Sequence, residues 1–455
     1  MKIIAYEEFK DIIFAEAKAY GFSDFEIYYV ESNSFTVKIF GGEVAEYKNT
    51  DTAGLSFRGT FNGRMGYAFT ETLEQSIIPL LIKNAADNAT IIEEEEIEKL
   101  YPGDPSYLKT NNYNPALNDT SIKQKIDLAM QMEKCAYEAD PLVKSVDYCQ
   151  LGTAEGTMKI ANSSGINLSD RSNIAYAYLS ARVEEDGITK TASEIWHGSD
   201  FSNFLPKEIA KAAAKRAISY LPAKSVQSGT YPIVFDNRTA CKIMSAFSST
   251  FFAEHAQKGF SLLLGKEGET IAANHITIRD DGIANYETFS QFAFDSEGVA
   301  TKQKAIVQDG VLKTLLYNTK SAGKEGKQST GNGFKGSFRA SVATACTNFY
   351  IVPSDTTPQE MRKKIKRGIL ITEIAGLHAG INATSGDFSI SSDGFLIEDG
   401  EITTPVEQIT VAGNFYSLLK DIECVANDLK FGVPSSGGTF GMPSILVREL
   451  PVSGL

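Results

Sequence analysis

The sequence is poor in the two residue types that most often bind metals or form cross-links. Its 455 residues include only four histidines and five cysteines. The cysteines are scattered, odd in number and without a CxxC pair, which argues against a disulfide framework and against a zinc ribbon. We therefore expect buried free thiols at Cys135, Cys149, Cys241, Cys346 and Cys424.

Long apolar runs are also missing. Runs such as Leu80 to Ile82 and Leu262 to Leu264 fall far short of the ~20 residues that cross a bilayer. Acidic residues at Glu7, Glu8 and Asp11 stand where a signal peptide would carry basic charge. The sequence therefore predicts a soluble, cytoplasmic protein that does not contact a membrane.

Positive charge is in deficit, with 44 lysines and arginines against 57 acidic residues and a net charge of −13. Such a chain repels phosphate backbones, so we expect no direct nucleic-acid binding. The hydrophobic share of 42% is that of an ordinary globular protein. A chain of this length exceeds what one core usually holds, so two domains are expected.

Residues 1–222 read as a mixture of helices and strands. Apolar spacing predicts a first helix from Tyr6 to Tyr20, and alternation predicts strands that include Phe25 to Val30 and Phe35 to Phe40. Asn62-Gly63 predicts a hairpin because both residues tolerate positive φ. The acidic, proline-containing stretch 91–119 is typical of an exposed connection.

A domain boundary is expected at the polar stretch 223–229. Beyond it, Asp309-Gly310 and Asp399-Gly400 predict hairpins, and helices are expected near 239–257 and after Thr357, which fits a capping box. Strands and helices are grouped rather than alternating. The prediction is an α+β protein with an N-terminal α/β sandwich-like domain, 1–222, and a β-rich C-terminal domain with antiparallel sheets, 223–455.

Catalytic motifs are scarce, since no GxSxG, HExxH or P-loop is present. The nearest zinc motif is Phe251 to His255, which has phenylalanine where an HxxEH pattern needs histidine. His255 with Glu254 is more simply a solvent-facing pair at a helix end. A weaker alternative is an independent hydrolase that uses Glu254, His255, His275 and Asp280 or Asp281; Asp280-Asp281-Gly282 is more simply a turn.

Several phrases of the second half occur together in one known family. They are FDSEGV (294–299), SGDFS (385–389), GFLIEDGEI (394–402) and ITVAGN (409–414), and GLSFRGTFNGRMGYAFT (54–70) adds weaker support. The sequence resembles the TldD/PmbA family, most densely over residues 225–455. The family is also described as containing modulators of DNA gyrase.

The resemblance carries an expectation about zinc. In the TldD type, an HExxxH helix precedes the Lys-Gly that is here Lys258-Gly259, and a later cysteine completes the zinc site. Counting back places the three motif positions on Met244, Ser245 and Ser249, and the stretch 433–444 has no cysteine. The chain therefore resembles the PmbA (TldE) type, with no cofactor of its own and zinc expected in a TldD-type partner.

The function implied is that of a non-catalytic subunit in a cytoplasmic peptidase that acts on unfolded peptides. The partner would be a TldD-type subunit, or a second copy in a homodimer. By analogy, Ser385, Gly386, Asp387, Phe388, Ser389, Gly437 and Gly438 would line the peptide cleft. Each of these glycines alone could instead serve a tight turn.

The alternative function, from the family's other description, is a binding regulator of the DNA gyrase modulator type without a peptidase role. Its only basic cluster is Arg362 to Arg367. On the predicted helix these charges would spread around the axis and form a solvated surface.

Overall fold

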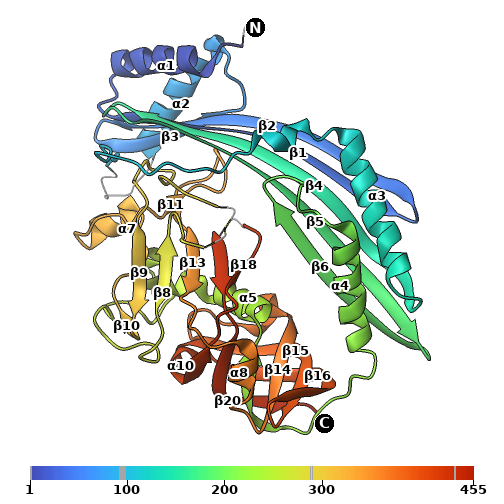
Figure 1. Cartoon of the computed structure of the whole chain (residues 1–455). Helices are drawn as coiled ribbons and strands as arrows, with labels where there is room; N and C mark the ends of the chain where they lie inside the picture. The colour runs from blue at the N-terminus through green and yellow to red at the C-terminus, as the bar shows by residue number, and fades with distance from the viewer. Residues whose placement is uncertain (1–2, 92–98, 287, 289, 435–436) are drawn as a thin grey trace.

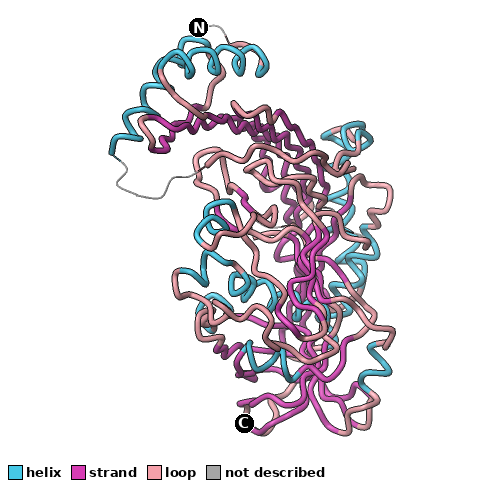
Figure 2. The backbone as a smooth tube through the Cα atoms, turned by 90° about the vertical axis from the view of Figure 1, so that its left-hand side faces the viewer, coloured by secondary structure: helices cyan, strands magenta, loops and turns pink. Residues whose placement is uncertain are grey.

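The computed structural model describes residues 3–91, 99–286, 288, 290–434 and 437–455. A long, curved antiparallel sheet formed by the first half of the chain arches over the β-rich second half (Figure 1). Helix α1 and the C-terminal end of the chain lie at opposite ends of the molecule in both views (Figures 1 and 2). No helix of the described residues is long and apolar enough to cross a membrane.

The first sheet has the strand order β3-β2-β1-β4-β5-β6. Its strands are β1 (Phe25–Phe40), β2 (Glu43–Phe61), β3 (Arg64–Thr70), β4 (Val143–Asn162), β5 (Asn167–Glu185) and β6 (Ile188–Gly198). The hairpin at Asn62-Gly63 is confirmed, with φ values of 50° and 80°. The two strands predicted within 25–40 are one, because the polar residues between them stay paired on both sides.

Four helices cover the outer face of this sheet. Along β1, Ile27 and Tyr29 pack with one helix pair and Phe35, Val37 and Ile39 with the other, so all the odd-numbered side chains point outward. The helices are α1 (Tyr6–Tyr20), α2 (Ile78–Ile91), α3 (Ile122–Ala139) and α4 (Pro206–Ser219). The predicted bounds of the first helix are confirmed; Gly21, at φ 113°, ends it.

The second half contains two further six-stranded sheets. One has the order β10-β9-β8-β13-β19-β18, with strands β8 (Ile278–Asp281), β9 (Gln303–Gln308), β10 (Val311–Leu312), β13 (Asn348–Ile351), β18 (Lys430–Phe431) and β19 (Thr439–Met442). The other has the order β16-β15-β14-β7-β20-β17, with strands β7 (Gly229–Phe235), β14 (Arg367–Ala375), β15 (Asp387–Glu398), β16 (Glu401–Asn414), β17 (Ile422–Val425) and β20 (Ile445–Ser453). A small pair joins β11 (Gly333–Phe334) and β12 (Ala343–Thr344).

The α+β class with antiparallel sheets is confirmed, although the pairs β13–β19 and β14–β7 are parallel. The turns at Asp309-Gly310 and Asp399-Gly400 have positive φ, as predicted for hairpins. The strands of the first sheet all precede residue 223 and those of the other sheets follow it. The division at 223–229 itself stays a prediction.

The helices of the second half are short: α5 (Asn237–Phe247), the 3-10 turn η3 (Ser248–Phe251), α6 (Ala253–Gln257), α7 (Thr319–Lys324), α8 (Pro358–Arg362), α9 (Leu377–Gly380) and α10 (Phe415–Asp421). The single helix predicted near 239–257 is therefore wrong. Its interruption has a local cause, because the hydroxyls of Ser248 and Thr250 bond back to carbonyls three residues earlier.

The basic helix predicted over Arg362–Arg367 is also wrong. The capping box at Thr357 forms as expected, but α8 ends at Arg362 and Arg367 already begins β14. Ile365, between the basic residues, is buried in a hydrophobic cluster. Burying it turns the chain out of the helix.

The connection 91–119 was predicted to be exposed, and its residues 92–98 lie outside the described part of the chain. From 99 on it carries little regular structure, apart from the turn Pro115–Asp119. It is nevertheless hydrogen-bonded to the second half. Tyr107 donates to the Gly298 carbonyl at 2.8 Å, and Asn112 donates to the Gln291 carbonyl at 2.6 Å. This segment therefore joins the two halves.

Candidate functional site

A cavity of about 780 Å³ lies between the two halves of the chain. Its walls come from β5, β6 and α4 on one side and from α5, β14 and the β18–β19 pair on the other. Arg238, Cys241, Lys242 and Ser245 form its floor, since their spacing places them on one face of α5. We refer to this cavity as the cleft.

Ion pairs connect the two halves along the cleft. Arg238 of α5 pairs with Glu194 of β6, and Lys190 of β6 pairs with Glu407 of β16. These partners are 44 and 217 residues apart in sequence. The two pairs hold the edge of the first sheet against the second half, and in each pair the cation and the carboxylate neutralise each other.

A second group of charges meets at Glu373 of β14. Its carboxylate accepts from Arg216 of α4 at 3.1 Å and from Lys242 of α5 at 2.6 Å. Arg216 also donates to the Thr372 carbonyl. Three elements distant in sequence therefore converge on one carboxylate beside the cleft.

Two sheet edges border the cleft. Among the described strands, β6 is the last of the first sheet and pairs with β5 alone, while β18 is the last strand of the neighbouring sheet. Backbone groups on the outer side of an edge strand have no ladder partner, so they can bond an extended chain. The cleft therefore has the geometry of a site for an extended polypeptide.

The three zinc-motif positions have different surroundings. Met244 is 2% exposed and belongs to the hydrophobic core. Ser245 is exposed and lines the cleft, and Ser249 is half-buried in the 3-10 turn. A thioether and two hydroxyls are not zinc ligands, so the residues present do not fit the metal. Within the described ranges, no group of three or more His, Cys, Asp or Glu residues could hold a metal ion.

Cys241 is the cysteine that reaches the cleft. Its thiol donates to the Phe440 carbonyl at 3.1 Å, and burial raises its pKa to about 12. It is therefore not a thiolate nucleophile at neutral pH. All five cysteines are free as predicted, but Cys135 and Cys241 are only half-buried.

The segments predicted to line a peptide cleft are not among the residues that line this cavity. Ser385 donates to Asp387 at 2.8 Å in a tight turn, Gly386 has φ 84°, and Phe388 is in the core. Ser389 is exposed, on β15. Neither this segment nor Gly437-Gly438 is part of the cleft wall, and their contact with a peptide stays a prediction.

Glycine is required for backbone geometry at two of these positions. A Cβ at Gly386 would stand 2.5 Å from the Tyr416 ring. At Gly438, which has φ 114°, it would stand 2.5 Å from the Cys346 carbonyl oxygen. Close packing and positive φ account for both glycines.

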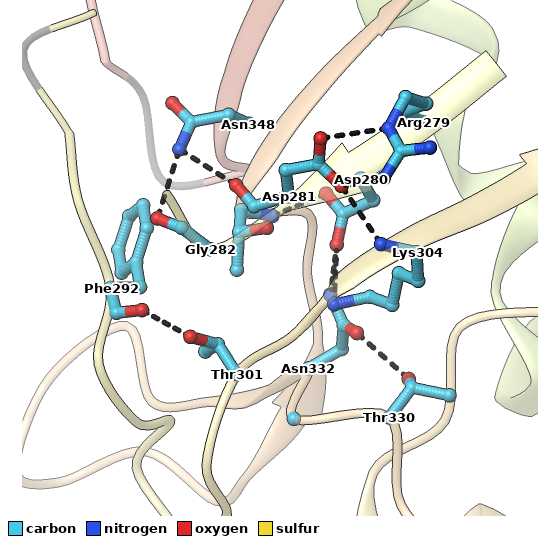
Figure 3. Close-up of polar contacts among 12 residues, drawn as sticks. Arg279, Asp280, Asp281, Gly282, Phe292, Thr301, Lys304, Thr330, Asn332 and Asn348 are labelled. Carbon is cyan, nitrogen blue, oxygen red and sulfur yellow. Dashed lines mark hydrogen bonds and ion pairs between the residues drawn. The ribbon is translucent and has the colours of Figure 1, made fainter. Parts of the chain in front are cut away.

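Asp280 and Asp281 lie in strand β8, so the turn predicted for them is wrong. Figure 3 shows them in a buried polar network. Asp280 accepts from Asn332 at 2.8 Å and pairs with Lys304 at 3.1 Å. Asp281 accepts from Arg279 at 2.9 Å. Their carboxylates are engaged in holding strands together.

The histidines of the hydrolase alternative are not assembled with these aspartates. His255 is half-buried between the rings of Phe252 and Phe260, where burial lowers its pKa, so the predicted solvent-facing position is wrong. Its neighbour Glu254 pairs with Lys258 at 2.6 Å. His275 is exposed. No described contact joins either histidine to Asp280 or Asp281.

Comparison with known proteins places this architecture among metallopeptidase-like folds. Three family models match in order: PmbA/TldA metallopeptidase domain 1 over residues 25–89, the central domain over 115–221, and the C-terminal domain over 228–454. The chain belongs to the PmbA/TldD family.

Relatives match along almost the whole chain. The metalloprotease PmbA of Escherichia coli O157:H7 is 25% identical over 470 residues, covering 100% of this chain and 99% of the relative. A Thermotoga maritima protein named as a modulator of a DNA gyrase is 31% identical, with TM-score 0.89 and coverage of 99% and 100%. TldE from Thermococcus kodakarensis shares the fold, with TM-score 0.88, 22% identity and coverage of 98% and 100%.

Sequence reasoning missed most of the cleft. Lys190, Arg216 and Glu373 come from three elements that no local pattern connects. Only the face of α5 had a readable signal, since Arg238, Lys242 and Ser245 recur at helical spacing.

Proposed function

We propose that this chain is the PmbA/TldE-type subunit of a cytoplasmic zinc metallopeptidase complex that acts on unfolded peptides. A TldD-type partner would hold the zinc, and a homodimer would be the form adopted without that partner. The observation that carries the proposal is the place of Ser245. It stands at the motif's glutamate position and faces the cleft, yet it offers neither a base nor a metal ligand.

Chemistry at this floor is limited by the groups present. Activation of water at neutral pH needs a metal or a base with a suitable pKa. The Ser245 hydroxyl provides neither, and the Cys241 thiol is protonated. The isolated chain is therefore expected to bind peptides without cleaving them.

The size of the cleft supports an unfolded substrate. A cavity of about 780 Å³ suits a short extended segment rather than a folded domain. The neighbouring edge of β6 offers backbone hydrogen bonds that do not depend on the peptide's sequence.

Reconstitution tests the proposal. The chain is incubated with an unstructured fluorogenic peptide alone, with a TldD-type subunit, and with that subunit plus a zinc chelator. We expect cleavage only in the second mixture, and elemental analysis of the isolated chain should find no stoichiometric zinc. Chelator-sensitive cleavage by the chain alone, with about one zinc per chain, would contradict the proposal.

The alternative is a regulator of the DNA gyrase modulator type, and it rests on the name of the Thermotoga neighbour. The net charge of −13 and the interruption of the basic run by buried Ile365 weaken it. A gel-shift titration at moderate salt separates the two: firm, salt-sensitive DNA binding favours the regulator.

A further inference from the structure

The inner face of the first sheet continues the wall of the cleft. Because the odd-numbered side chains of β1 and their neighbours pack under the helices, the alternate residues point toward the second half. On β4, β5 and β6 these include Tyr148, Tyr178 and Ile195. We call these three residues, two tyrosines and one isoleucine, the aromatic row.

The aromatic row is contiguous and accessible. The Tyr148 and Tyr178 rings meet edge to face with centroids 5.3 Å apart, and Tyr178 is directly opposite Ile195 across the β5–β6 pair. Tyr148 is 38% exposed and Ile195 49% exposed. Tyr178 and Ile195 also line the cleft, so the row extends from it along the sheet.

Hydrogen bonds hold the tyrosines in place. The Tyr148 hydroxyl donates to Gln150 at 2.7 Å, and the Tyr178 hydroxyl lies 2.7 Å from that of Ser193. Both partners belong to the sheet itself. Ordering these side chains on binding therefore costs little, as expected of a preorganised surface.

The charges beside the row are already paired. Lys38 lies 5.3 Å from the Tyr148 ring and pairs with Glu46, and Arg182 pairs with Asp147. A surface with neutralised charge and exposed rings does not attract phosphate. It fits aromatic and large aliphatic side chains.

We propose that the aromatic row selects apolar side chains of the extended peptide that occupies the cleft. This inference rests on the proposed function, since it assumes a peptide in the cleft. Alternate side chains of an extended peptide are about 7 Å apart on one side, and the row spans three strands, or roughly 10 Å. It therefore takes one or two apolar side chains at that spacing.

The test uses two labelled, unstructured peptides of equal length and charge. One carries phenylalanine and leucine at alternate positions, and the other has serine and glycine there. Fluorescence anisotropy measures their binding to the whole protein and to the variants Tyr148→Ala and Ile195→Ser. Tyr137→Ala is the matched control, because that tyrosine is 42% exposed on α3 at the outer face.

We expect the apolar peptide to bind at least about tenfold more tightly than the other, and each row variant to weaken it about five- to tenfold. The control should change nothing, and the serine-glycine peptide should respond to no variant. Equal binding of both peptides, unchanged in the row variants, overturns the aromatic row but leaves peptide binding in the cleft intact. If neither peptide binds the unmodified protein, peptide binding by this subunit fails as well.

Both row variants replace partly exposed side chains, so loss of the fold is not expected. Circular dichroism confirms that each variant is folded. Tyr148→Phe adds an independent check, because it keeps the ring. Binding retained in Tyr148→Phe and lost in Tyr148→Ala supports the row, whereas equal loss in both points to the hydroxyl and contradicts it.

Discussion

Removing the Arg58 guanidinium should destabilise the junction between the two halves more than any surface charge does. Arg58 and Glu26 are directly opposite each other on β2 and β1 and form an ion pair at 2.8 Å. They are 5% and 0% exposed, and one oxygen of Glu26 has no hydrogen-bond partner in the described structure. The nearby Glu297 adds a second buried carboxylate.

Arg58→Met would leave two buried carboxylates without their cation. Breaking a buried pair by removing one partner typically costs about 3–5 kcal/mol, whereas replacing both partners by apolar residues is often close to neutral. We therefore expect about 3–5 kcal/mol lost in Arg58→Met and part of it regained in the double variant with Glu26→Met, which still retains the buried Glu297. Arg448→Met is the control, since its pair with Glu423 is exposed and should cost less than about 1 kcal/mol.

Urea unfolding followed by tryptophan fluorescence measures these differences. The chain has one tryptophan, Trp196, which lies on β6 and packs against the first sheet's own core. Its signal therefore reports unfolding of the half that carries Arg58. Losses below about 1 kcal/mol in the single variant, or equal losses in the single and double variants, would refute the argument from uncompensated charge.

Two further predictions concern the junction and the turn at residue 386. Burial raises the pKa of Glu297, so the folded state takes up this proton at a higher pH than the unfolded state does, and stability should rise as the pH falls toward the ordinary range of a glutamate. Glu297→Gln should flatten that part of a plot of unfolding free energy against pH, and an unchanged slope would contradict the prediction. Gly386→Ala should cost about 1–3 kcal/mol through positive φ and contact with Tyr416, measured by thermal unfolding, whereas Gly41→Ala, at positive φ in open space, should cost less. Equal losses of stability in the two variants would show that the Tyr416 contact adds nothing to the loss in Gly386→Ala.

Local sequence rules worked where the determinants were local. Gly21 ends the first helix at the predicted residue, and Asn62-Gly63 forms the predicted hairpin. They failed where two local signals compete or where distant contacts decide. The stretch after Phe247 reads as continuous helix until the serine and threonine hydroxyls compete for its carbonyls, and Ile365 leaves a helical pattern because it has a core to fill.

In the candidate site, too, only the features set by local sequence could be predicted. Counting back from Lys258-Gly259 assigned Ser245 to the family's motif, and in the structure that residue lines the cleft. The peptide contacts assigned to Gly386 and Gly438 came from analogy and stay a prediction, while close packing and positive φ also account for both glycines. The cleft wall could not be read from the sequence, since Lys190 and Glu407 are 217 residues apart and their pairing depends on how the sheets meet.

The arched sheet has a consequence for the order of events during synthesis. Its strands are complete once residue 198 has been made, but part of its inner face is covered only by residues made much later. Gly54, which has no side chain, leaves room against the sheet for the ring of Phe338. At about 5–20 residues per second, the ribosome needs on the order of ten seconds to reach that ring. During this interval a nascent chain would present the uncovered sheet face to solvent, so we expect the first half to be prone to aggregation until the second half has been made.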